Sequence, residues 1–400
     1  MRVPSRRFFT PAVLTLIFST FLLGMSEFVI VGILPDVARS LDVSEVTVGN
    51  LVAVFAVVYA PCTPFGSSYV ARFPRFAAHV ALIAVFLAGN VLCAFAVGYG
   101  MLVVGRVVIA VVSGTLVAVA MTYASDVTSP RNRTRFIAWV FSGFSVASVV
   151  GVPVGTWLAG ALGWRWAFHL IDALTLALLA AMAVTLPRGG RPTRVGFLAQ
   201  FRLFFDRRIQ LGVLAVVFGA AASYTFYTYL TPMLRDEVGV PARYVSTALV
   251  VYGLACLWSN LVSGRLAARG KGVEPLTHIR PIYLAQAMLL FLLAFAAEVP
   301  ALGAVLLVAL GMMMYLQNSA SQVLYMDTAA SSHPGSMNLA ASLNSMSFNI
   351  GIALGSAVGG AVDDASGLRW LGPSGAVFAL LAAGTVTLLR RYVVDPNQPV

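Results

Sequence analysis

Long apolar segments recur along the whole sequence, and each is separated from the next by a short stretch that holds Pro, Gly or charged residues. A helix of about 20 apolar residues spans the hydrocarbon core of a bilayer, where every backbone polar group must be satisfied within the protein. Cutting the sequence at these stretches predicts an all-α polytopic membrane protein with twelve membrane-spanning helices. They cover residues 12–34, 46–69, 76–97, 100–124, 136–160, 165–186, 209–232, 244–268, 281–298, 301–326, 335–361 and 370–389.

The composition agrees with this architecture. Of the 400 residues, 59% are apolar and only 10% are charged, whereas about a quarter of the residues are charged in an average soluble protein. No polar segment is long enough to form a separate soluble domain. The formal net charge is +11, but the basic residues lie in short loops between apolar segments, so the sequence does not favour nucleic-acid binding.

The basic residues are distributed unevenly between the two sides of the membrane. With the N-terminus inside, twenty Arg or Lys residues fall in inner segments and five in outer ones, and Arg106 lies within a span. Basic loops remain in the cytoplasm, so both termini are expected there, with the protein in the plasma (inner) membrane. The first apolar segment follows three arginines, as in a signal peptide, but it continues to Pro35 without a cleavage site and is expected to be a retained helix.

The longest basic connection divides the chain into two sets of six predicted helices. We expect an N-terminal six-helix bundle at 1–186, a cytoplasmic linker at 187–208 and a C-terminal six-helix bundle at 209–400. Similar ends of spans 2 and 8 and similar stripes of small residues in spans 5 and 11 suggest a tandem repeat, which is typical of secondary transporters. The stripes are Gly143, Ala147, Gly151, Gly155 and Ala159, and Ser347, Gly351, Gly355 and Gly359. The alternative is that any Gly- and Ala-rich membrane protein carries such stripes.

Three charged residues lie well inside predicted spans, where charges are costly and often functional: Glu27, Arg106 and Asp172. From the rise of about 1.5 Å per residue, Glu27 lies ~12 Å below Pro35, the expected outer end of its span, and Arg106 lies ~9 Å below Gly100. A carboxylate and a guanidinium at one depth predict a proton switch, in which a proton or a cationic substrate displaces their interaction. The alternative is a permanent ion pair that only fixes helix packing.

Asp172 is a further candidate for proton coupling. It lies ~12 Å below Trp164 and three residues beyond His169. We expect His169 and Asp172 to pair on one helix face, which would neutralise the acid without a role in transport.

Polar and aromatic side chains concentrate in spans 7, 10 and 11. A chamber lined by aromatic, amide and Met side chains suits amphipathic organic molecules, because rings and thioethers adapt to varied shapes. The candidate substrate-binding residues are Tyr224, Tyr227, Thr228, Gln317, Asn318, Asn338, Ser345 and Asn349. Hydrogen bonding between helices is the alternative role for each of them. No cofactor or metal is predicted, because His and Cys lack ligand spacing and Lys271 lacks the upstream glycine of a phosphate-binding loop.

Several motifs resemble those of the major facilitator superfamily, and within it the drug:proton antiporter group that includes sugar-efflux and chloramphenicol-exporter-like proteins. They are Ser26-Glu27-Phe28 with Gly32-Ile33-Leu34-Pro35, Gly151-Val152-Pro153-Val154-Gly155, Gly163-Trp164-Arg165 and the segment from Asn344 to Gly360. The resemblance implies a transporter fold of two bundles, Glu27 as the proton-coupling acid, Arg106 as the span 4 arginine, and Gly151, Pro153 and Gly155 as a conformational motif.

The sequence departs from the family at two places. Val70 and Ala71 stand where a cytoplasmic latch commonly has Asp and Arg, so a latch of the usual form is not expected. Ile109 and Ala110 stand where the span 4 motif commonly has Gln and Gly.

These features together predict a proton-coupled antiporter that exports small organic compounds, such as drugs, sugars or nucleoside-like molecules, by alternating access. We expect a monomer whose partners are protons, a small-molecule substrate and the lipid bilayer. The main alternative is a proton symporter that imports a small solute. A membrane enzyme or receptor is disfavoured, because the sequence shows neither a catalytic cluster nor a large extramembrane domain.

Overall fold

The computed structural model describes residues 8–70, 72–129, 132–188, 201–267, 279–295, 298–333 and 336–391, and these residues form helices and connecting turns without a β-strand. In chain order the elements are α1 (Pro11–Leu41), α2 (Glu45–Val70), α3 (Arg75–Ala94), α4 (Tyr99–Thr122), α5 (Ala124–Val127), α6 (Arg133–Val146), η2 (Ala147–Gly151), α7 (Val152–Leu162), α8 (Arg165–Thr185), η3 (Phe201–Phe205), α10 (Arg207–Tyr227), α11 (Leu230–Pro232), η4 (Met233–Glu237), α12 (Ala242–Ala267), α14 (Arg280–Leu292), η5 (Leu293–Phe295), α15 (Pro300–Met313), α16 (Asn318–Ser332), α17 (Met337–Ser366), η7 (Leu368–Trp370) and α18 (Leu371–Arg391).

Eleven of the described helical segments are long and apolar enough to cross a membrane, and Arg280–Phe295 is a shorter apolar one. The chain is therefore a multi-pass membrane protein, and the all-α prediction is confirmed. The predicted linker falls largely on residues 189–200, which lie outside the described part of the chain.

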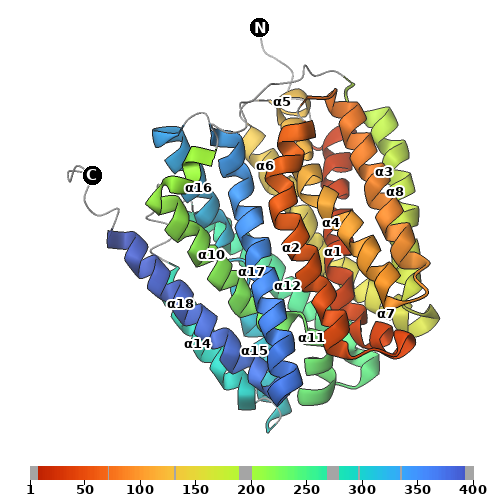
Figure 1. Ribbon diagram of the computed structural model, residues 1–400, viewed down its shortest axis with the longest axis vertical. Coiled ribbons are helices and arrows are strands. Elements are labelled where there is room, and N and C mark those ends of the chain that lie inside the picture. The colour runs from red at the N-terminus through yellow and green to blue at the C-terminus, as the bar shows by residue number, and fades with distance from the viewer. Residues whose placement is uncertain are drawn as a thin grey trace.

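The helices form two groups (Figure 1). α1–α8, in red to yellow, lie on one side of the molecule, and α10–α18, in green to blue, lie on the other. We call these groups the N-terminal and C-terminal helices. α2 packs against α17, α12 packs against η2 and α7, and α1 packs against α11, so these elements form the boundary between the groups. We call the end of the bundle that holds Pro11 and Arg391 the terminal face, and the opposite end, where Leu41 connects to Glu45, the distal face.

The first helix is longer than predicted. It ends at Leu41 rather than near Pro35, and Asp42, with a left-handed φ of 53°, closes it by donating its backbone N–H to Ala38 O. Proline removes one hydrogen bond from a helix, but its φ is compatible with the helical conformation, so the helix continues through it. Glu27 therefore lies fourteen residues, or about 21 Å, before the observed helix end rather than eight residues before it.

Predicted span 136–160 is not a continuous α-helix. It consists of α6, the π-helical turn η2 and α7. Pro153 has no N–H to donate, and just before it the N–H of Val152 bonds to Ala147 O, five residues back. The helix therefore has one wider turn at the Gly-Val-Pro-Val-Gly motif, closed by a hydrogen bond to the fifth residue back instead of the fourth.

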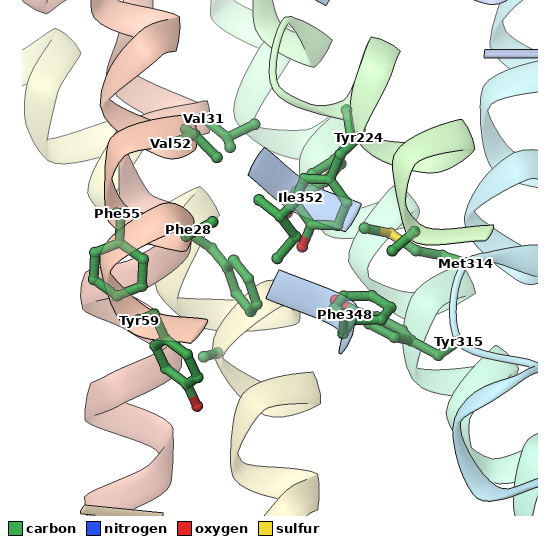
Figure 2. Packing of buried hydrophobic residues seen from close by; sticks show 14 of the residues in the cluster. Phe28, Val31, Val52, Phe55, Tyr59, Tyr224, Met314, Tyr315, Phe348 and Ile352 are labelled. Atoms are coloured by element: carbon green, nitrogen blue, oxygen red, sulfur yellow. The ribbon is translucent and has the colours of Figure 1, made fainter. Parts of the chain in front are cut away.

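Predicted span 301–326 is also interrupted, between α15 and α16. The N–H groups freed by this break are satisfied by α12: Tyr315 N donates to Ser259 Oγ and Ser319 N to Ser263 Oγ, each at 2.9 Å. The break places Tyr315 at the boundary, as the close-up of buried residues shows (Figure 2).

The two stripes of small residues pack within their own groups of helices. A Cβ on Gly155 of α7 would lie 2.5 Å from Val29 Cγ2 of α1, and a Cβ on Gly355 of α17 would lie 2.5 Å from Ala221 O of α10. The first stripe therefore lies against α1 and the second against α10, the first long helix of each group. This correspondence is what two related halves would show.

Candidate transport site

Arg106 connects α4 to α1 inside the N-terminal helices. Its side chain is fully buried, with Nη1 donating to Ser26 O at 2.6 Å and Nη2 to Glu27 O at 3.2 Å. The guanidinium also lies 4.4 Å from the centroid of the Phe55 ring, a favourable cation–π distance. The structure thus brings Arg106 and Glu27 together, but through the backbone of α1.

The Glu27 carboxylate is half-buried and accepts no hydrogen bond from the described residues. It interacts electrostatically with Arg106 without forming an ion pair within 4 Å. It also interacts electrostatically with four tyrosines from both sides of the boundary: Tyr59, Tyr224, Tyr227 and Tyr315. A permanent salt bridge, the alternative role for these two charges, is not the arrangement found.

Five buried aromatic rings of the C-terminal helices form a continuous row, and three of its tyrosines, Tyr224, Tyr227 and Tyr315, interact with Glu27. In order they are Tyr252, Tyr227, Tyr224, Phe348 and Tyr315, with successive centroids 5.5, 5.1, 5.8 and 5.7 Å apart. We call them the aromatic row. Beside it Met314 Sδ accepts a hydrogen bond from the Tyr252 hydroxyl at 3.4 Å.

The N-terminal helices present aromatic side chains to the same boundary. Figure 2 shows Phe28, Phe55 and Tyr59 on one side, with Tyr224 and Phe348 on the other. The row and these rings together form an aromatic boundary region beside the Glu27 carboxylate.

The predicted substrate residues fall into two sets. Tyr224 and Tyr227 belong to the aromatic row, and Ser345 Oγ bonds to the Tyr59 hydroxyl at 2.9 Å across the boundary. Asn349, one turn along α17, donates Nδ2 to Ser345 O at 3.1 Å and leaves its buried Oδ1 without a partner. These four side chains lie at the boundary.

The remaining predicted residues lie mainly inside the C-terminal helices. Thr228 Oγ1 bonds to Ser356 Oγ at 2.7 Å, and Gln317 Oε1 accepts from the Tyr283 hydroxyl. Thr228 and Gln317 therefore form hydrogen bonds between helices, which was the alternative to substrate binding for these residues. Asn318 Oδ1 is buried without a partner, and the side chain of Asn338 lies outside the described ones.

Sequence reasoning missed most of the rings at the boundary. Phe28, Phe55, Tyr59, Tyr252 and Phe348 were not among the candidates, because an aromatic residue in an apolar span looks like ordinary core. The available signal was the spacing of Phe55 and Tyr59, four residues apart and therefore on one face of α2.

Asp172 does not form the expected pair with His169. The His169 ring lies against Phe95 and Trp166, with centroids 5.1 and 5.5 Å away. Asp172 is only 8% exposed, and its Oδ1 is buried without a hydrogen-bond partner. The local neutralisation predicted for this acid is therefore wrong.

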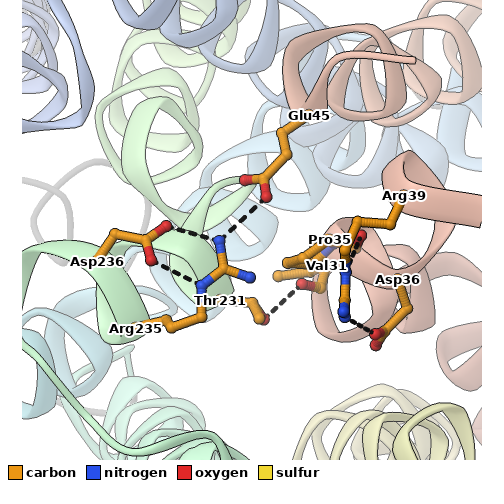
Figure 3. Close-up of polar contacts among 8 residues, drawn as sticks. All are labelled: Val31, Pro35, Asp36, Arg39, Glu45, Thr231, Arg235 and Asp236. Atoms are coloured by element: carbon orange, nitrogen blue, oxygen red, sulfur yellow. Dashed lines mark hydrogen bonds and ion pairs between the residues drawn. The ribbon is translucent and has the colours of Figure 1, made fainter. Parts of the chain in front are cut away.

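The two groups of helices are joined at the distal face (Figure 3). Arg235 of η4 forms an ion pair with Glu45 of α2 at 3.2 Å and with its neighbour Asp236 at 2.7 Å. Deeper in, the Thr231 hydroxyl donates to Val31 O of α1 at 2.7 Å. The structure is therefore closed between the groups at the distal face.

The helix with the Gly-Val-Pro-Val-Gly motif has two packing faces. On one face, Gly151 packs against α1, and a Cβ built on Gly151 would lie 2.9 Å from Met25 Cγ. On the other face, α12 packs against the π-helical turn η2, and a Cβ built on Gly253 would lie 2.6 Å from Ser148 O. Asn260 Nδ2 adds a hydrogen bond to Ser145 Oγ at 2.9 Å. The motif glycines thus hold α7 to its own group, and other residues face the boundary.

At the terminal face, the position of the usual latch acid is occupied by Val70. Arg75 instead donates to Thr122 O at 2.9 Å and pairs with Asp126, both within the N-terminal helices.

Comparisons with known proteins agree with this geometry. A sequence model of the Major Facilitator Superfamily matches residues 16–342. The chain is 30% identical over 385 residues to the uncharacterized MFS-type transporter YtbD of Bacillus subtilis (strain 168), covering 95% of this chain and 96% of that protein. It is 31% identical over 255 residues to a chloramphenicol resistance protein of Streptomyces lividans, covering 62% of this chain and 64% of that protein.

Among solved structures, the chain is similar to a bacterial homolog to the human lysosomal transporter Spinster, in an inward-facing and unoccupied conformation. The TM-score is 0.75 at 18% identity, with 97% of this chain and 98% of that chain covered. This likeness shows a common fold.

Proposed function

The chain belongs to the Major Facilitator Superfamily, and from that premise we propose that it is a proton-coupled antiporter that exports small organic compounds by alternating access. The observation that carries the proposal is the placement of Glu27. Its carboxylate accepts no hydrogen bond from the described residues, it lies at the boundary between the two groups of helices, and it interacts electrostatically with the buried Arg106. Such an acid can bind and release a proton as the boundary opens and closes.

The surroundings of Glu27 support an amphipathic substrate such as a drug, a sugar or a nucleoside-like molecule. Aromatic rings and the Met314 thioether adapt to varied organic shapes, and Ser345 and Asn349 supply hydrogen-bonding groups beside them. Similarity to a chloramphenicol resistance protein supports export as the direction of transport. One proton that crosses a potential of ~100 mV supplies ~2.3 kcal/mol, which sustains a gradient of a few tens-fold.

The proposal includes the topology of the chain. The excess of Arg in segments of the terminal face favours the cytoplasm for both termini, in the plasma (inner) membrane. Two six-helix halves at 1–186 and 209–400 would rock about the boundary as a monomer, with no enzymatic activity.

The experiment is proton-driven transport by the purified protein in proteoliposomes. Chloramphenicol is the first compound to test, followed by a panel of amphipathic drugs and sugars, with proton release from acidified vesicles as the signal. Glu27→Gln mimics the protonated acid, so we expect it to lose accumulation driven by a pH gradient while retaining downhill exchange.

The matched control is Glu298→Gln, since Glu298 is 59% exposed and forms its ion pair with Arg369 within the C-terminal helices. Wild-type accumulation by Glu27→Gln would remove Glu27 from proton coupling.

A further inference from the structure

A cavity at the distal face is lined entirely by residues of the N-terminal helices. Its volume is about 520 Å³, within the range of roughly 300–1,000 Å³ that is usual for small-molecule sites. The end of α1, the end of α7 and the beginning of α8 line it. None of its lining residues belongs to the proposed substrate or proton site, so the transport function does not account for its chemistry.

Arg165 contributes a guanidinium that is held in a fixed position in the wall of this cavity. Its Nε and Nη2 both donate to Ala96 O, at 3.1 and 2.6 Å, and its guanidinium carbon lies 4.3 Å from the centroid of the Trp164 ring. These contacts leave Nη1 without a hydrogen bond to the described residues, among which Arg165 also has no ion pair. A half-buried guanidinium with a free nitrogen and no counter-ion favours an anionic ligand.

The end of α1 adds a second guanidinium to the same cavity. Arg39 pairs with Asp36 at 2.5 Å, and both residues line the cavity. The Arg39 side chain is mostly exposed, so it is able to turn toward a ligand. The charged side chains of the lining are therefore two guanidinium groups and one carboxylate, and His169 adds an imidazole. This excess of positive charge matches a monoanion such as a phosphodiester, which guanidinium groups bind through parallel hydrogen bonds.

Apolar side chains beside the cavity favour a lipid over a soluble anion. Leu162 and Trp166 line the cavity, Phe95 packs against His169 with centroids 5.1 Å apart, and all three apolar side chains are more than half exposed. They lie at or next to the ends of membrane-spanning segments, where aromatic residues meet the lipid head groups. A soluble anion gains nothing from these side chains, whereas the acyl chains of a lipid cover them.

We propose that this cavity binds the phosphate head group of an anionic phospholipid such as phosphatidylglycerol. Arg39 and Arg165 bind the phosphate, and the exposed apolar side chains beside the cavity contact the acyl chains. In the topology proposed above, this lipid belongs to the outer leaflet. Because it connects the end of α1 to the beginning of α8, its binding stabilises the folded N-terminal helices. The inference goes beyond the transport function and does not involve Glu27.

Native mass spectrometry of the purified protein tests the site, because it counts the lipid molecules that stay bound when detergent is removed. The protein is titrated with phosphatidylglycerol and, separately, with phosphatidylcholine that has the same acyl chains. We expect one phosphatidylglycerol to bind several-fold more tightly, because the choline group removes the net negative charge of the head group. Equal affinities for the two lipids would overturn a site for an anionic head group.

Two substitutions assign the binding to the cavity. Arg165→Gln removes the fixed guanidinium, so we expect the affinity for phosphatidylglycerol to fall about tenfold or more through the loss of charged hydrogen bonds. Arg39→Gln should lower it by a few-fold, because that side chain is mostly exposed and already paired with Asp36. The exposed position of Arg39 also keeps the test available if Arg165→Gln fails to fold. Wild-type affinity in either folded variant would overturn the site.

Arg243→Gln is the matched control, since Arg243 is an exposed arginine near the beginning of α12 and outside the cavity. It should leave the affinity for phosphatidylglycerol unchanged. An equal loss in Arg243→Gln and Arg165→Gln would mean that binding follows net charge alone, which would overturn the proposal. Inorganic phosphate and glycerol phosphate are then added at millimolar concentration. Displacement of the lipid by either compound would assign the cavity to a soluble phosphate instead.

Thermal unfolding in detergent provides a second measurement. A lipid that binds only the folded protein raises the unfolding temperature, and we expect phosphatidylglycerol to raise it more for the wild type than for Arg165→Gln. An equal rise in the two proteins would place the stabilising lipid elsewhere and overturn the proposal. Neither measurement depends on transport. Loss of accumulation in Glu27→Gln with no selective lipid binding would therefore reject only the lipid site, and the reverse result would reject only the role of Glu27.

Discussion

Pro35 leaves the carbonyl of Val31 without its usual partner inside α1, because that carbonyl would accept from the N–H that proline lacks. The Thr231 hydroxyl, from the C-terminal helices, donates to this carbonyl at 2.7 Å. The arrangement is visible in Figure 3. Pro35 thus leaves a backbone carbonyl of α1 without a hydrogen bond from its own helix, and a side chain of the opposite group of helices supplies that bond.

This pairing predicts the effect of Thr231→Val. The variant leaves Val31 O unsatisfied when the distal face is closed, so we expect closure to weaken by about 0.5–1.5 kcal/mol, a shift of a few-fold toward distal opening. Distances between spin labels on Ser40→Cys and Arg243→Cys measure that opening. Thr225→Val is the control, because the Thr225 hydroxyl bonds to Ala221 O within its own helix. Identical distance distributions in the Thr231→Val variant and the wild type would refute the role of this bond.

Asp206 caps the N-terminus of α10 just outside the membrane-spanning segment. Its carboxylate accepts from Arg208 N at 2.8 Å and from Arg208 Nη2 at 2.7 Å, and His333 Nε2 lies 3.7 Å away. Partial burial alone would raise the pKa of Asp206, but the hydrogen bonds from Arg208 lower it below the ordinary value. The charged form therefore stabilises the folded protein.

We expect Asp206→Ala to lose about 1 kcal/mol of stability at neutral pH, as measured by thermal unfolding in detergent. Because the folded pKa is lowered, the stabilisation is present above the unfolded value of about 3.9 and is lost as the pH falls through the lower folded value. The difference in stability between Asp206→Ala and the wild type should therefore become smaller as the pH falls below about 3.9. A difference that is independent of pH would mean that the charge contributes nothing.

At the scale of helices, the stripes of small residues determine which elements pack together. Gly155 has Val29 of α1 against it, whereas Gly160 on the same helix has nothing within 4 Å of the position of a Cβ. A β-branched neighbour such as Val29 has little rotamer freedom with which to move away. The two glycines therefore lie on the same helix but differ in packing, because only Gly155 has a close neighbour on another helix.

This difference predicts that Gly155→Ala costs about 1–3 kcal/mol of stability through overpacking, whereas Gly160→Ala is neutral or slightly stabilising. Thermal unfolding of both variants in one detergent compares them directly. Equal unfolding temperatures for the two variants would show that the Gly155 contact is relaxed in the protein. The motif glycines would then have to act in some way other than close packing.

At the scale of the whole molecule, closure of the distal face depends on contacts between the two groups of helices. Arg235 and Glu45 are about one-third exposed in their ion pair, and Asp236 and Glu45 raise the pKa of the Arg235 guanidinium. Exposed pairs of this kind contribute about 0.2–1 kcal/mol and are screened by salt. Such a contact is weak enough to open and close during a transport cycle.

We expect Glu45→Gln to shift the closed and open populations of the distal face by up to about fivefold at low salt, and by less at high salt. The same spin-label pair reports it. Glu298→Gln, which breaks an exposed pair with Arg369 inside the C-terminal helices, should leave those distances unchanged. A salt-independent shift, or an equal one in both variants, would contradict an electrostatic role for Glu45.

The sequence by itself determined the class of fold. Segments of about 20 apolar residues have one stable form in a bilayer, so the helical class and the approximate positions of the helices follow from hydropathy alone. Isolated charges in such segments are rare and costly, which is why hydropathy and charge were sufficient to select Glu27, Arg106 and Asp172 as candidates. The common depth of Glu27 and Arg106 followed from helix geometry, although the end of α1 did not.

Only the tertiary structure decided the partners of these residues. Arg106 bonds to carbonyls of α1 rather than to the Glu27 carboxylate, His169 packs against Phe95 rather than pairing with Asp172, and the aromatic row joins α10, α12, α17 and the break after α15. Hydropathy specifies that a residue is in the membrane, but not the direction in which its helix faces. That direction depends on the close approach of glycine stripes and on backbone groups freed at Pro35 and Pro153, which are contacts between segments far apart in the chain.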